Sequence, residues 1–270
     1  GYVVFVGPSS VIDGPSPGFG NLRIDAGSLT LQSDASVLRS LTNTSSAATT
    51  AGSNAFVMTG GNASLQAGPG VLHHVRVASG TTTAFDAKVS HLEVVGGVLR
   101  VAPNATPQVT TLLELTGGTL AWQNGFAGTL DVLGDVVHVA TAAGANDQPV
   151  QFLKVHGKWT GSALFDMSVG YVVFVGPSSV IDGPSPGFGN MRVDAGSTST
   201  ASSTSVTRSL VVQPTASLTV NSGSLTTTTT QPLAIDGTLT ISSSATLNLN
   251  TASMTISPTG ALRVVGSAVS

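Results

Sequence analysis

Apolar residues recur along the chain in short triplets of the form apolar–x–apolar. One series of triplets begins at residues 22, 41, 56, 75, 92, 113, 130, 153, 172, 191, 210, 233 and 254. Its twelve intervals range from 15 to 23 residues and average about 19. Alternate side chains of a β-strand point to the same face, so each triplet would bury two side chains and expose one. The pattern predicts short strands, because no helical stripe has this spacing.

Further triplets lie between the members of this series and indicate three strands per turn. Near the C-terminus, triplets open at spacings of 6, 8, 7 and 8 residues, at Leu233, Leu239, Leu247, Met254 and Leu262. Gly, Asn, Ser and Pro residues between the triplets supply the bends. Stacked coils of this kind predict an all-β fold. We expect a single continuous parallel β-helix, or β-solenoid, over residues 1–270, with about 13 to 14 turns of roughly 19 residues.

The chain also contains a long internal repeat, in addition to the series of triplets. Residues 1–28 return at 170–197 with 26 of 28 positions identical. The two differences are Leu22/Met191 and Ile24/Val193. The offset of 169 residues corresponds to nine turns of about 19 residues, which predicts a duplication of whole turns: a super-repeat of 1–169 with a partial second copy at 170–270. Because the chain starts on its own repeat without Met, we interpret it as a fragment of a longer protein.

The charge and amino-acid composition of the chain exclude several classes of binding partner. Charged residues make up 9% of the chain, the net charge is -3 and the pI is near 5.9. This balance provides no basic face for nucleic acid or for an anionic membrane. No run approaches the roughly 20 apolar residues of a membrane span. The absence of Cys excludes disulfides and thiolate metal sites, and no cofactor is expected.

Several segments carry a resemblance to a known family. They are LTGGTLAW, VVGGVLRV, IDGTLTISSSATLNLN and ISPTGALRVVGS. They resemble the repeats of right-handed parallel β-helix proteins, such as autotransporter passengers and other large extracellular surface proteins. The resemblance implies a right-handed coil and an elongated extracellular or cell-surface protein that forms filaments or mediates adhesion. Its motifs are compositional, so it bears on fold more than on function.

Charged residues form a row at the outward position of successive triplets. In order they are Arg76, Glu93, Glu114, Asp131 and Lys154. Neighbours in the row should lie one turn apart, so the three carboxylates Glu93, Glu114 and Asp131 could together chelate Ca²⁺. The alternative is a solvated face on which opposite charges pair.

Catalytic chemistry has little support in the sequence. The β-helices that are enzymes are mainly polysaccharide lyases and hydrolases, which need clustered carboxylates. The best pairs here are Asp131/Asp135 and Glu93/Glu114, without the paired-Asp and Gly-His-Gly signatures of pectin hydrolases. We therefore expect no enzyme.

Five histidines could supply metal ligands, but their spacing matches no recognised site. They are His73, His74, His91, His138 and His156. Only His74 and His91 should be neighbours on adjacent turns. Isolated surface or bend histidines are the alternative, which we favour.

The repeated block contains an unusual Pro- and Gly-rich segment, Gly7–Asn21, with its copy at Gly176–Asn190. Its composition predicts a loop that interrupts the ladder. The loop either packs a phenylalanine on the rod or contacts a partner. Candidate interface residues are Phe19, Pro15, Pro17, Phe188, Pro184 and Pro186.

Three sequons, at Asn43, Asn62 and Asn104, match the acceptor pattern for glycosylation. A chain so rich in Ser and Thr is expected to contain about this many by chance. They are compatible with secretion without arguing for it.

Three functional hypotheses follow. The first is an extracellular structural rod that associates with itself or with neighbouring subunits in a filament, wall or appendage. The second is an adhesin that binds glycan or another surface. Exposed aromatic residues would support it, and the candidates are Trp122, Trp159, Phe126 and Phe165, although burial in the core is the alternative that we favour. The third, a polysaccharide-active enzyme, is the weakest.

Overall fold

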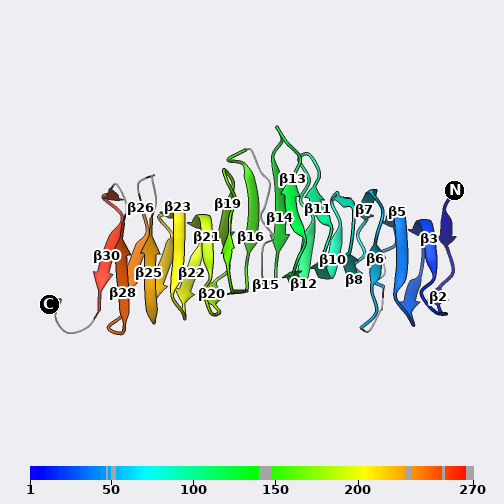
Figure 1. Ribbon diagram of the computed structural model, residues 1–270, viewed down its shortest axis with the longest axis horizontal. Coiled ribbons are helices and arrows are strands. Elements are labelled where there is room, and N and C mark those ends of the chain that lie inside the picture. The colour runs from blue at the N-terminus through cyan, green and yellow to red at the C-terminus, as the bar shows by residue number, and fades with distance from the viewer. Residues whose placement is uncertain are drawn as a thin grey trace.

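The computed structural model shows an all-β coil whose strands stack along one long axis, with the two termini at opposite ends (Figure 1). It describes residues 1–46, 48–49, 53–139, 148–228, 231, 233–250 and 253–265. The fold is a parallel β-solenoid of about 12 turns with ~21 residues per turn. Within the described ranges there is no helix that could cross a membrane.

Each turn has three faces, which we number in the order in which the chain visits them. Long strands bend at a corner and belong to two faces. Face 1 is an unbroken ladder of β3 (Gly18–Ile24), β5 (Ala35–Asn43), β6 (Phe56–Met58), β8 (Leu72–Val77), β10 (Lys88–Val94), β12 (Gln108–Leu115), β15 (Asp135–His138), β17 (Lys158–Gly161), β20 (Ser178–Asp182), β22 (Gly196–Thr200), β24 (Ala216–Val220), β27 (Thr238–Ile241) and β30 (Ala261–Val264).

The other two faces are built in the same way. Face 2 contains β1 (Val3–Phe5), the second parts of β3 and β5, β7 (Asn62–Ala67), β9 (Thr81–Ala84), β11 (Val98–Val101), β13 (Thr119–Trp122), β18 (Leu164–Phe165), the first parts of β21 (Gly187–Val193) and β23 (Thr204–Val212), β25 (Gly223–Thr227) and β28 (Ala245–Leu249). Face 3 contains β2 (Ser9–Ile12), β4 (Ser28–Leu31), the first parts of β8, β10 and β12, β14 (Gly128–Val132), β16 (Gln151–Val155), β19 (Tyr171–Phe174), the second parts of β21 and β23, β26 (Leu233–Ile235) and β29 (Met254–Ile256).

The predicted alternation of inward and outward residues is confirmed. In β10, Leu92 and Val94 are buried while Glu93 between them faces outward. Because equivalent residues of adjacent turns stack in register, the inward side chains form one continuous apolar core from Ile12 to Ile241. Burial of each such aliphatic side chain contributes about 1.5–3 kcal/mol, which is the main source of stability.

The period differs from the 19 residues expected, and the turns number about 12 rather than 13 to 14. The reason is that the triplet series changes face twice. Leu41 lies on face 2, whereas the next member, Phe56, lies on face 1. Leu113 lies on face 1 and pairs with Val136, but the series continues at Leu130 on face 3. Each change of face skips part of a turn and shortens the apparent period.

The two copies of the repeat lie on different faces. Phe19 belongs to face 1, whose ladder continues to β20, whereas its copy Phe188 pairs with Phe165 on face 2. The offset is therefore a whole number of turns plus one face, and the expectation of nine whole turns is wrong. The local pairing is nevertheless the same, since β1 pairs with β3 as β19 pairs with β21. The same strand–corner–strand unit therefore fits at two different places around the turn.

The Pro- and Gly-rich segment does not interrupt the ladder. It forms β2 and the first part of β3, and its copy forms β20 and the first part of β21. Phe188 and Pro186 are buried, Phe19 and Pro17 are half-buried, and Pro15 and Pro184 are exposed. The prediction of an interruption is therefore wrong, whereas the alternative in which the phenylalanine packs on the rod describes Phe188, a core residue that lies edge-on against Phe174.

Candidate functional site

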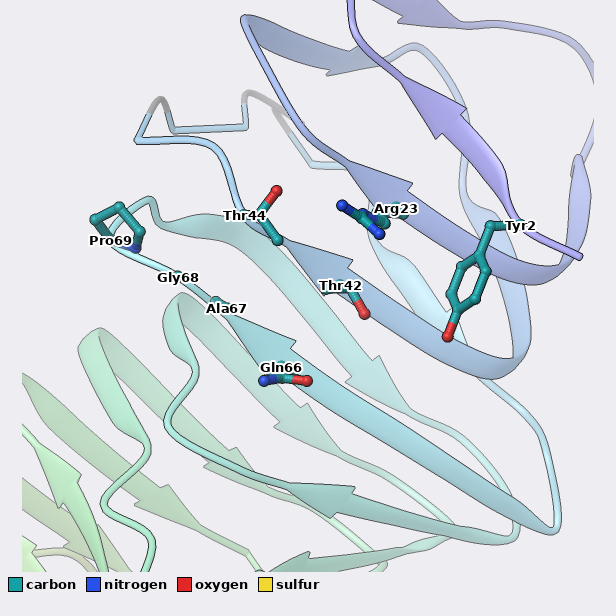
Figure 2. Close-up of a pocket in the computed structure, with 8 residues that line it drawn as sticks. All are labelled: Tyr2, Arg23, Thr42, Thr44, Gln66, Ala67, Gly68 and Pro69. Carbon is teal, nitrogen blue, oxygen red and sulfur yellow. The ribbon is translucent and has the colours of Figure 1, made fainter.

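A groove of about 560 Å³ crosses face 2 near the N-terminal end of the rod (Figure 2). Its lining comes from the first strands of that face and from the bend after β7: Tyr2, Arg23, Thr42, Thr44, Gln66, Ala67, Gly68 and Pro69. The volume falls within the range of about 300–1,000 Å³ that is usual for small-molecule sites.

The floor of the groove follows from strand register. Arg23 of β3 is paired with Thr42 of β5, and Thr42 is paired with Gln66 of β7. Each of these residues lies between two inward neighbours, so the alternation of the strand turns its side chain outward. Tyr2 and Pro69 lie on opposite sides of this row, as Figure 2 shows.

One ion pair sets the charge of the groove. The Nε atom of Arg23 donates to Oδ1 of Asp25 at 2.5 Å, and the hydroxyl of Thr44 donates to the same oxygen at 2.8 Å. The hydrogen bonds from Arg23 and then from Thr44 hold the pKa of Asp25 below its usual range. The carboxylate therefore stays ionised and offsets the Arg23 charge at neutral pH.

The second copy of the repeat builds a related surface on face 3. Arg192 donates to Asp194 through Nε at 2.5 Å and through Nη2 at 2.7 Å. Its guanidinium carbon lies 4.9 Å from the ring centroid of Phe152 and 5.5 Å from that of Tyr171. A groove of about 390 Å³ adjoins this pair, lined by Arg192, Asp194, Gln213, Pro214 and Thr215.

A charged corner lies farther along the rod, where β8, β10 and β12 pass from face 3 to face 1. The rings of His74 and His91 stack with their centroids 4.2 Å apart and an interplanar angle of 5°, so the predicted neighbour relation is confirmed. His91 Nε2 lies 2.8 Å from Glu114 Oε2, and Arg76 Nε donates to Glu93 Oε2 at 2.5 Å. Burial, then the charge of His91, lowers the pKa of His74. Because the stacked rings are parallel, their in-plane lone pairs do not converge on one ion.

The predicted row of three carboxylates is not formed. Glu93 and Glu114 are neighbours in register, but the next position after Glu114 is Val137. Asp131 lies on face 3 opposite Gln108, because the triplet series changes face at this point. Within the described ranges no group of three or more His, Cys, Asp or Glu residues could hold a metal ion. The interpretation as a Ca²⁺ row is corrected accordingly.

The carboxylate pair Asp131/Asp135 is also divided between faces, by the corner that separates β14 from β15. Asp131 Oδ1 lies 3.0 Å from His156 Nε2. Asp135 Oδ1 accepts a hydrogen bond from the backbone of Lys158 at 2.7 Å and so stabilises a bend of the next turn. Each carboxylate therefore has a local structural partner.

The remaining histidines occupy different environments. His73 is half-buried, and its backbone donates to the Thr49 hydroxyl. His138 is buried in the core against Trp159 and Phe165, at ring-centroid distances of 5.9 and 5.3 Å. Burial lowers the pKa of His138 to about 4.

The aromatic candidates for an exposed platform are mostly core residues. Trp122, Trp159 and Phe165 are buried, and of the four only Phe126 is exposed. An exposed aromatic residue beside polar groups is instead Tyr2, which the sequence analysis missed. The available signal was the set of Tyr, Arg and Asp that recurs at identical offsets in both copies of the block.

The three sequons differ in accessibility. The side chain of Asn43 is buried, and its Oδ1 accepts a hydrogen bond from the backbone of Ser45 at 3.0 Å. Asn43 therefore cannot carry a glycan in this fold. Asn62 and Asn104 are exposed.

Comparisons with family models, with curated proteins and with solved structures gave no match to this chain. The assignment of the fold as a parallel β-solenoid therefore rests on the strand pairing described above.

Proposed function

We propose that this protein is an extracellular structural protein, a rigid β-helical rod that acts as a building block of a filament, wall or appendage. The observation that carries the proposal is the unbroken ladder of face 1, which runs from β3 to β30. Bending the rod would have to lengthen backbone hydrogen bonds and separate the core stacks at the same point.

The length of the rod supports a role as a structural building block. About 12 turns at the inter-strand spacing of about 4.8 Å give a rod on the order of 60 Å long. The outward side chains are mostly small or polar, so the faces can pack beside neighbouring subunits. The right-handed coil and the extracellular location come from the family resemblance and belong to this proposal.

Electron microscopy of the native material, with a gold-labelled antibody against this chain, tests the proposal. We expect label along filaments, wall layers or surface appendages. Label that is confined to the interior of the cell, or that is dispersed on isolated soluble particles, would contradict a structural role.

A further inference from the structure

The internal repeat carries one surface arrangement to two places on the rod. Tyr2, Arg23 and Asp25 correspond to Tyr171, Arg192 and Asp194, and both Arg–Asp pairs border a groove. The copies lie on different faces and have different neighbours. The Arg–Asp pair is therefore common to both copies, whereas the tyrosine differs: Tyr2 lines the first groove, and Tyr171 is half-buried beside Arg192 and does not line the second.

The core does not require these outward residues. The only two differences between the copies, Leu22/Met191 and Ile24/Val193, fall at buried positions where one apolar side chain replaces another of similar size. The exposed positions, where packing would tolerate many residues, are identical. An exposed Arg–Asp pair contributes little to stability, about 0–1 kcal/mol. Most buried positions of the block are identical too, and recent recombination of the segment would give the same match, so the chemistry of the groove and not this identity carries the inference.

The groove offers the groups that a sugar needs. The guanidinium of Arg23 is a donor, the amide of Gln66 is both donor and acceptor, and the hydroxyl of Thr42 is both. The ring of Tyr2 lies beside this row in the first described turn (Figure 2). An aromatic ring can cover the apolar face of a pyranose while the polar groups bond its hydroxyls.

The charge of the groove favours neutral glycans over acidic ones. Asp25 accepts from Arg23 and offsets its charge, and no other Lys, Arg, Asp or Glu lines the groove. We propose that the groove beside Tyr2, Arg23 and Gln66 binds a short segment of a neutral glycan, and that the groove beside Arg192 and Asp194 is a second site of the same class. A uronate or sialate would find no uncompensated cation in either groove. This inference goes beyond the structural role and does not depend on it.

Titration of the ¹⁵N-labelled protein with neutral trisaccharides, followed by NMR, tests the inference. The probes are maltotriose, cellotriose and mannotriose, with trigalacturonate as the acidic counterpart. We expect at least one neutral probe to shift the amide signals of Arg23, Thr42 and Gln66, together with those of Arg192 and Gln213. Trigalacturonate should bind more weakly than that probe.

Matched variants separate binding from folding. Gln66→Ala and Tyr2→Ala should each weaken binding at the first groove by about fivefold, because each removes one hydrogen bond or one stacking contact. Tyr2→Phe keeps the ring and should stay within about twofold of the original affinity. Gln32→Ala, an exposed position outside the groove, should change nothing, and unchanged thermal unfolding of each variant shows that the fold is intact.

Three results would overturn the inference. They are no shift with any neutral probe up to saturating concentrations, binding that is indifferent to Gln66→Ala and Tyr2→Ala, and stronger binding of trigalacturonate than of every neutral probe. None of them bears on the filament proposal, which is tested by labelling of the native material.

Discussion

At the scale of the residue, the repeat places identical side chains in two environments. Val3 is 46% exposed and its copy Val172 is 0% exposed. Phe19 is half-buried and Phe188 is fully buried. The cause is position along the rod, since the second copy is covered by the turn that precedes it while β1 and β2 form the end of the described ladder. Local sequence therefore sets which way a side chain points, but the adjacent turn decides how deeply it is buried.

This pair gives a matched test of burial. Phe188→Ala should lower the free energy of unfolding by about 3–5 kcal/mol, because it leaves a cavity between Trp159 and Phe174. Phe19→Ala should cost clearly less, since part of its ring already contacts water. Urea denaturation followed by circular dichroism measures both. Equal losses for the two variants would contradict the difference in burial.

His138 predicts a dependence of stability on pH. Burial lowers its pKa from 6.5 to about 4, so between these values the unfolded chain binds a proton that the folded chain excludes. Stability should therefore be complete above about pH 6.5 and fall as the pH drops toward 4. The largest loss from this residue is about 3 kcal/mol.

Thermal unfolding at a series of pH values between 7.5 and 4 measures this loss. His138→Leu removes one titrating group from an apolar site and should make the profile less steep in that window; the slope that remains includes the contribution of His74, whose pKa burial also lowers. A slope as steep in His138→Leu as in the original protein would contradict the prediction.

At the scale of the element, the bends hold the strands in register. Gly27 and its copy Gly196 have φ angles of 69° and 67°, in the left-handed region that favours glycine. A Cβ atom at either position would clash with a carbonyl of the preceding turn, that of Gly7 or Gly176 respectively. These bends are therefore constrained both by backbone conformation and by the close approach of the adjacent coil.

Gly196→Ala should consequently destabilise the protein by more than about 1 kcal/mol, because strain and contact act together. Gly18→Ala is the control, since its Cβ would meet nothing within 4 Å and its φ is not positive. The control should change the midpoint of denaturation little. An equal loss in both variants would show that the bend geometry is not the cause.

At the scale of the whole molecule, the turn is the unit of construction. In face 1, Leu92 is paired with Leu113 and Glu93 with Glu114. Removal of residues 93–113 would therefore join Leu92 to Glu114 in phase and delete one complete coil. The two turns that flanked the deleted coil would then stack directly on each other, through contacts of the same kind as those that each made with it.

We expect this deletion to give a folded rod that is shorter by about 4.8 Å, measured by X-ray scattering. Removal of residues 93–112 instead joins two inward residues, Leu92 and Leu113, and reverses the alternation of everything that follows in the strand. That variant should unfold at a much lower temperature. Similar melting of the two deletions would contradict a solenoid in this register.

Much of this architecture follows from sequence alone. Period-2 triplets such as Leu92–Val94 specify strands with one buried side, and the bends between them specify a coil with three strands per turn, because these patterns are local. The neighbour relation of His74 and His91 was predictable for the same reason. The exact number of residues per turn was not predictable, because a triplet has the same appearance on each of the three faces.

Tertiary structure alone decided which face each triplet occupies, and so which outward residues meet. It separated Asp131 from Glu114 and placed Gln66 beside Arg23 and Thr42. Sequence determined the direction of each side chain, because alternation within a strand is fixed by the backbone. Only the stacked coil determined its neighbours, because pairing between turns depends on the summed length of every bend between them.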